Sequence, residues 1–166
     1  LIASGKPAAL FYETLAERTL AIAQRERRAN PEKGYTPDLA GFVGPVLKRC
    51  VENGVPIIGN FGAANPMGAA KRLHALAKMQ GISGLRVAVV DGDDLRENIR
   101  GLQTQQWGEE KPLDLANTEI LAANVYMGSQ PIADALDQDP HVVVTGRVTD
   151  SALTLGPLMQ HFGLSL

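Results

Sequence analysis

The stretch VVVTGRVTDSALTLGPL, from Val142 to Leu158, decides how the chain is expected to fold. Its first half is a short, unbroken apolar run, as in a strand that is buried on both faces. Its second half spaces apolar residues as a helix does. Small and polar residues stand where the strand gives way to the helix: Gly146, Arg147, Asp150 and Ser151. Such a junction is either a well-made turn or a place where a ligand is held.

Strand-like and helix-like segments alternate through most of the chain. Apolar runs predict strands at 55–60, 85–90, 124–128 and 141–146. Helical spacing predicts helices at 7–30, 39–54, 67–81, 95–103, 115–123, 131–138 and 150–162. Short, continuously apolar strands are typical of parallel sheets. We therefore predict one α/β domain over residues 1–166, or most of one, with a mostly parallel open sheet and helices on both faces.

The composition excludes several classes of protein. The net charge is −2, and only 5% of the residues are aromatic, which argues against a nucleic-acid-binding surface. No apolar run approaches the roughly 20 residues of a membrane-spanning helix. The single cysteine, Cys50, leaves no intramolecular disulfide and favours a reducing compartment. We expect a cytoplasmic protein with no nucleic-acid or membrane partner.

Polar residues follow every predicted strand. Ligands in open parallel sheets bind beyond the carboxyl ends of the strands, so these residues are expected to converge on one edge. In chain order they are Asn60 and Asn65, then Asp91, Asp93 and Asp94, then Gly128 and Ser129, and finally Gly146, Arg147, Asp150 and Ser151.

The acidic run VVDGDDL places three carboxylates within four residues. Asp93 and Asp94 are candidate ligands of a divalent metal such as Mg²⁺, which prefers hard oxygen donors. Alternatively Asp91, Asp93 and Asp94, together with Asp150, supply a general acid and base. The plainer alternative is that Asp93 or Asp94 caps the following helix.

Arg147 is the candidate anion-binding residue. Its planar fork of donors suits a carboxylate or a phosphate, and the helix that begins near Asp150 adds backbone amides. Gly146 and Ser151 would complete this substrate-binding site, and Asn60 and Asn65 would orient the substrate. The alternatives are an Arg147–Asp150 ion pair and a capping role for Asn65. Glu13 and Glu17 are expected on one exposed face of the first helix.

Four stretches carry a family resemblance: YETLAERTLA, GNFGAANPMGAAKRL, VVDGDDL and VVVTGRVTDSALTLGPL. They resemble, in order and over nearly the whole chain, the N-terminal region of the acyclic terpene utilisation protein A family. The resemblance implies a piece of a longer polypeptide and a role in bacterial or fungal terpene catabolism through acyl-CoA intermediates. Many relatives have Asp where this chain has Glu13, and Glu where it has Asp91. The family's recurring polar positions fall on Glu17, Asn60, Asn65, Gly92, Asp93, Asp94, Gly146, Arg147, Asp150 and Ser151.

Three functional interpretations follow. The first is an enzyme domain, a hydrolase or lyase acting on a small anion or an acyl-CoA thioester. The second is a non-catalytic subunit that binds an acyl-CoA or a partner protein. The third is that the polar edge is structural. We also expect a homo-oligomer, associating through an open sheet edge or through the apolar helix from Pro7 to Ala23.

Overall fold

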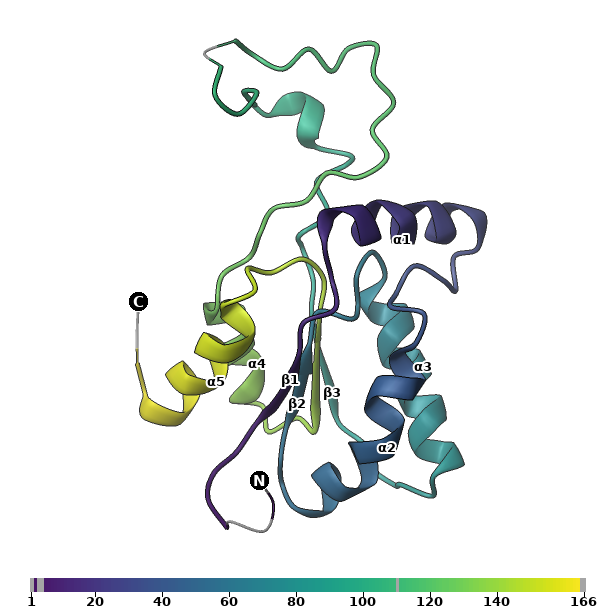
Figure 1. Cartoon of the computed structure of the whole chain (residues 1–166), viewed down its shortest axis with the longest axis vertical. Helices are drawn as coiled ribbons and strands as arrows, with labels where there is room; N and C mark the ends of the chain where they lie inside the picture. The colour runs from purple at the N-terminus through teal and green to yellow at the C-terminus, as the bar shows by residue number, and fades with distance from the viewer. Residues whose placement is uncertain (1, 3–4, 110, 165–166) are drawn as a thin grey trace.

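The computed structural model describes residues 2, 5–109 and 111–164 of the chain. At its centre is a sheet of four parallel strands in the order β1-β2-β4-β3 (Figure 1). The strands are β1 Leu10–Tyr12, β2 Ile57–Gly59, β3 Val87–Val90 and β4 Val142–Thr145. The predicted α/β class with a parallel sheet is therefore confirmed.

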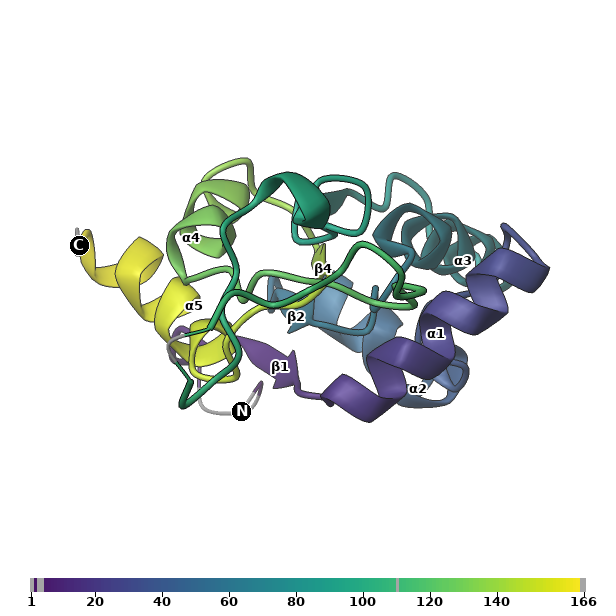
Figure 2. The ribbon, with the colours of Figure 1, turned by 90° about the horizontal axis from the view of Figure 1, so that it is seen from above.

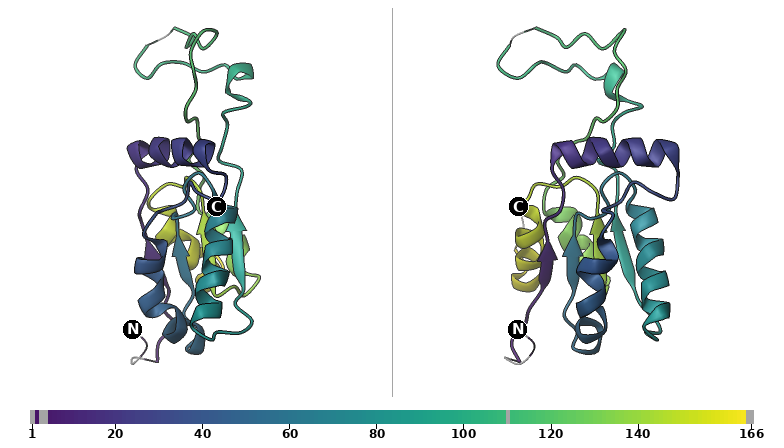
Figure 3. Two further views of the ribbon diagram at one scale, coloured as in Figure 1. Left: turned by 90° about the vertical axis from the view of Figure 1, so that its right-hand side faces the viewer. Right: turned by 45° about the vertical axis from the view of Figure 1, so that its right-hand side comes forward.

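Helices cover both faces of this sheet, as Figures 2 and 3 show. They are α2 Leu39–Glu52 and α3 Pro66–Met79 on one face, and α4 Gln130–Leu136 and α5 Ala152–Phe162 on the other. Neighbouring side chains on a strand point to opposite faces, so Ile57 packs with Leu47 of α2 while Ile58 packs with Leu153 of α5. No helix in the described part of the chain has the length and apolarity to cross a membrane.

Helix α1 (Glu17–Ala29) lies across the carboxyl edge of the sheet, not on either face (Figure 1). Its buried residues Leu20 and Ala23 pack with Leu15, Ala63 and Ala64, which belong to the segments that leave β1 and β2. The helix therefore covers the edge at which ligands bind in open parallel sheets.

The predicted helix over residues 7–30 is wrong in its first half. Leu10–Tyr12 forms β1, which pairs with β2 in register, and Leu10 N donates to Pro56 O at 2.9 Å. The local sequence supports a helix, but pairing with the sheet decides the conformation. Glu13 consequently lies in the turn between β1 and α1, and it does not share a helical face with Glu17.

The predicted helix over 115–123 and the predicted strand over 124–128 are also wrong. Residues 95–109 and 111–123, here called the arm, extend away from the sheet (Figure 3) and contain a short 3-10 turn, Ile99–Gly101, in place of the helix expected there. The segment 124–128 makes only isolated bridges, Asp94 with Asn124 and Met127 with Val148. Arm residues such as Trp107 stay exposed because the described chain offers no surface that buries them.

Candidate functional site

The ends of all four strands meet under α1. β2 contributes Asn60, β3 contributes Asp93, and β4 contributes Gly146 and Arg147, as the positions of these residues after their strands predict. Glu13, which follows β1, also lies here. This position was not expected, because Glu13 was predicted to lie within a helix.

Asn60 is fully buried at the centre of this edge. Its Oδ1 accepts hydrogen bonds from Thr14 N at 2.8 Å and from Thr14 Oγ1 at 3.2 Å, and its Nδ2 donates to Glu13 Oε1 at 3.0 Å. These partners fix which end of the amide is oxygen, because a backbone N–H requires an acceptor and a carboxylate requires a donor. Asn60 thus joins the end of β2 to the turn that follows β1.

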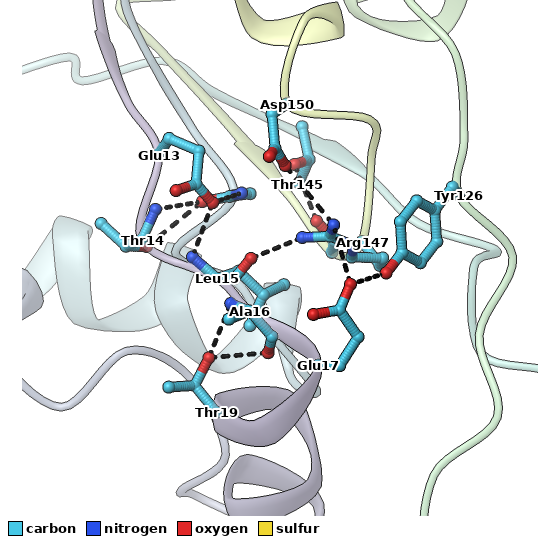
Figure 4. Close-up of polar contacts among 12 residues, drawn as sticks. Glu13, Thr14, Leu15, Ala16, Glu17, Thr19, Tyr126, Thr145, Arg147 and Asp150 are labelled. Atoms are coloured by element: carbon cyan, nitrogen blue, oxygen red, sulfur yellow. Dashed lines mark hydrogen bonds and ion pairs between the residues drawn. The ribbon is translucent and has the colours of Figure 1, made fainter.

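Glu13 is held by one of its two carboxylate oxygens. Besides the bond from Asn60, Oε1 accepts a hydrogen bond from Leu15 N at 3.0 Å (Figure 4). Both hydrogen bonds that the structure gives this side chain fall on Oε1. The orientation of the carboxylate is therefore fixed while Oε2 remains available to a ligand.

Arg147 is buried, and its charge is already balanced by the chain itself. Its guanidinium donates to Leu15 O, lies 3.5 Å from Glu17 Oε1 and 3.4 Å from Asp150 Oδ1, and stacks 4.0 Å from the centre of the Tyr126 ring (Figure 4). The Arg147–Asp150 ion pair, one of the alternatives drawn from the sequence, is present. An external anion would have to displace one of two carboxylates, both of which are largely exposed.

Tyr126 connects the arm to α1. Its hydroxyl donates to Glu17 Oε1, and this hydrogen bond lowers the pKa of Glu17 and raises the pKa of Tyr126. Glu17 is the first residue of α1, so the contact holds the start of the helix against the segment that returns from the arm.

Asp93 is a buried carboxylate, 2% exposed, that ties β3 to β4. Its Oδ2 accepts hydrogen bonds from Arg147 N at 2.8 Å and from Asn124 Nδ2 at 2.7 Å. Burial raises the pKa of Asp93 above its ordinary value, and these hydrogen bonds offset only part of that effect. The carboxylate lies against Gly146, where an added Cβ would stand 2.2 Å from Oδ1.

Asp94 and Asp91 have hydrogen-bond partners different from those of Asp93. Arg96 Nε and Nη2 bind both oxygens of Asp94 at 2.7–3.0 Å. Burial would raise the pKa of Asp94, but the hydrogen bonds from Arg96 and Gln24 outweigh it and lower the pKa. Asp91 is exposed and accepts from Gly92 N. Within the described residues, no three His, Cys, Asp or Glu side chains are grouped so as to hold a metal ion.

Asn65 lies away from this group and has a capping role. Its Oδ1 accepts from Gly68 N at the start of α3, and its Nδ2 donates to Pro31 O and Lys33 O. Its polar atoms are thus engaged with the backbone. Ser151 lies exposed just before α5 and makes no side-chain capping bond to it.

A groove of about 500 Å³ opens beside Glu13, between α1 and the segment that leads into α2. Here "the groove" means the space lined by Tyr12, Glu13, Thr14, Leu15, Thr19, Ile22, Ala23, Glu26, Tyr35, Thr36, Pro37, Asp38, Phe42 and Ala63. Most of its wall is apolar. A volume of this size lies within the roughly 300–1,000 Å³ usual for small-molecule sites.

Neither the groove nor the position of Tyr126 beside Arg147 was predicted from the sequence. The groove depends on the turn after β1, which was predicted to be helical. Tyr126 was assigned to a strand, so its ring had no predicted position near Arg147. One available signal was the pair of bulky residues Phe11 and Tyr12 next to Leu10, a composition that favours a strand.

Comparison with known proteins gives one family. Residues 1–166 match the sequence model of the family described as acyclic terpene utilisation family protein AtuA. No curated protein and no solved structure matches the chain.

Proposed function

The chain belongs to the acyclic terpene utilisation family, and from this premise we propose that it binds an acyclic terpenoid in the groove at the carboxyl edge of its sheet. The observation that carries the proposal is the groove itself, a mostly apolar space whose lining includes the Glu13 carboxylate, held by hydrogen bonds. Family membership supports an acyclic terpenoid as the ligand class, and the groove supports a site for it.

The apolar lining suits an open hydrocarbon chain. Tyr12, Ile22, Phe42 and Ala63 line it, and Ile22 and Phe42 are 45% and 39% exposed without a ligand. Covering such surface stabilises a complex by roughly 25 cal/mol for each Å² of apolar area removed from water. An acyclic chain follows a groove more readily than a fused ring system does.

Glu13 is the residue we assign to the polar end of the ligand. Asn60 and Leu15 hold Oε1, so Oε2 accepts a hydrogen bond from a ligand hydroxyl. In an enzyme the same oxygen would accept the hydroxyl proton as a general base. In a non-catalytic binding domain it would only orient the ligand.

An acyl-CoA thioester is the second candidate ligand. The observation in its favour is the Nε of Arg147, a buried donor without a hydrogen-bond partner among the described residues. The phosphates of the acyl-CoA would have to displace Glu17 or Asp150 from Arg147, so we rank this ligand second.

The test is calorimetric titration of the protein with geraniol and, separately, with octanoyl-CoA. We expect geraniol to bind, and Ile22→Trp, which fills the groove from α1, to weaken binding about tenfold or more. Leu155→Trp is the matched control, because Leu155 is also a half-exposed helical aliphatic residue but lies outside the groove. Failure of geraniol to bind, or an equal effect of both substitutions, would contradict the proposal.

A further inference from the structure

Resting on the proposed function, we infer that the groove selects terpenoids that carry a free hydroxyl and excludes those that end in a carboxylate. The selectivity arises from the charge and the hydrogen-bonding groups of the groove wall.

All the full charges that the described residues place on the wall of the groove are carboxylates. Glu13, Glu26 and Asp38 line it, while lysine, arginine and histidine are absent from the lining that the described residues provide. A ligand carboxylate would therefore meet like charges at the rim with no counter-charge, and like charges repel most strongly where water is partly displaced. An uncharged ligand avoids this cost.

The nearest buried cation does not compensate. Arg147 touches Leu15 O, the backbone oxygen of a residue that lines the groove, but its side chain pairs with Glu17 and Asp150. Neither Arg147 nor these two partners line the groove. The positive charge of Arg147 is therefore neutralised outside the groove.

The threonine hydroxyls of the wall and the hydroxyl of Tyr12 are already engaged by the protein. Thr19 Oγ1 donates to Ala16 O, and Thr14 Oγ1 donates to Asn60 Oδ1 and also contacts Thr36 Oγ1. Of the three carboxylates that line the groove, Glu13 is the one that hydrogen bonds hold in a fixed orientation, so we assign its Oε2 as the acceptor for the ligand. A carboxylate acceptor is satisfied by a ligand that donates, so an alcohol fits and an ether does not.

This selectivity places the chain within a reaction sequence. An acyclic terpenoid has a hydroxyl before its terminal carbon is oxidised, and a carboxylate afterwards. The groove would act on the alcohol, ahead of the oxidation that yields the acid.

The experiment compares three ligands of one carbon skeleton by calorimetry at pH 7.5: geraniol, geranyl methyl ether and geranate. We expect geraniol to bind at least about tenfold more tightly than geranate, which corresponds to roughly 1.4 kcal/mol, and several-fold more tightly than the ether. The double variant Glu13→Gln, Asp38→Asn should bring the geraniol-to-geranate ratio toward one. Glu52→Gln, on an exposed carboxylate of α2 outside the groove, should leave the ratio unchanged.

The outcomes separate this inference from the proposed function. Absence of geraniol binding overturns the proposed function. Equal binding of the three ligands, or tighter binding of geranate, overturns the selectivity and leaves the groove as the terpenoid site. A ratio that survives in the double variant shows that the carboxylates do not cause the selectivity, and also overturns the inference.

Discussion

Arg147 and Tyr126 form a stacked pair, with the guanidinium carbon 4.0 Å from the ring centre. Both residues are positioned by Asp93: its side chain binds Arg147 N, and its carbonyl oxygen accepts from Val125 N, next to Tyr126. The stack therefore joins the end of β4 to the segment that returns from the arm, directly beside the first turn of α1.

Two substitutions of Tyr126 distinguish the contribution of its ring to stability from that of its hydroxyl. Tyr126→Leu removes the cation–π contact, and we expect the free energy of unfolding to fall by about 0.5–1 kcal/mol. Tyr126→Phe keeps the ring and loses the hydroxyl bond to Glu17, an exposed residue, so the expected loss is smaller than that of Tyr126→Leu. Urea denaturation of both variants measures the difference. Equal losses would mean that the stack contributes nothing.

Removing the side chain of Asn60 should affect stability and ligand binding together. Asn60→Ala deprives Thr14 N of its acceptor and Glu13 of one of its donors. We expect a loss of about 1–3 kcal/mol in the free energy of unfolding, and weaker geraniol binding. Asn53→Ala at the end of α2 is the control, because Asn53 is exposed and its side chain bonds only to Arg49 O among the described contacts. Full geraniol affinity in Asn60→Ala would argue against the role given to Glu13.

The buried carboxylate of Asp93 gives stability a pH dependence of defined sign. Because burial raises the pKa of Asp93 in the folded state above its ordinary value of 3.8, the folded protein holds the extra proton between the two values. The contribution of Asp93 to the free energy of unfolding therefore falls as pH rises through that window, by at most about 1.4 kcal/mol per pH unit. Asp93→Asn should remove this slope when urea denaturation is followed from pH 4 upward.

Asp94 provides the opposite case for comparison. The pKa of Asp94 is lowered, since the bonds from Arg96 and Gln24 outweigh burial, so its charged form stabilises the fold above pH 3.8, and this stability is lost on acidification. Asp94→Asn should therefore be less stable than the unchanged protein at pH 7, with a deficit that shrinks in acid. If the stabilities of Asp93→Asn and Asp94→Asn, each relative to the unchanged protein, changed in the same direction with pH, this account would be excluded.

Gly62 stands where the backbones of two segments approach each other. A Cβ at this position would lie 2.5 Å from Thr145 O and 2.9 Å from the Cα of Pro66, both of which are backbone atoms. We expect Gly62→Ala to lower the free energy of unfolding by about 1–3 kcal/mol. Gly128→Ala, at a glycine with open space around its Cβ position, serves as the control in the same thermal or urea unfolding experiment.

The sequence predicted those parts of the fold whose pattern is decided locally. β2, β3 and β4 are unbroken apolar runs, and α3 begins with Asn65 as its cap and Pro66 in its first turn, as the sequence indicates. β1 was not predicted because its three residues lie among helix formers, and only pairing with β2 makes them a strand.

The candidate site was predictable to the same extent. Asn60, Asp93 and Arg147 each follow a correctly predicted strand, so the sequence placed them on one edge. Their partners Thr14 and Asn124 come from segments whose conformation depends on contacts distant in sequence. Only one of the two carboxylates that pair with Arg147 was predictable, since Asp150 is near Arg147 in sequence and Glu17 is not.

The position of Trp107 in the arm determines what optical spectroscopy reports on this protein. It is the only tryptophan of the chain, and the residue is 99% exposed. We therefore expect it to emit as a solvated indole already in the folded state, so unfolding of the sheet should barely change its emission. Circular dichroism of the backbone is therefore the signal for unfolding, and a blue shift of the tryptophan emission reports instead that something has covered the arm.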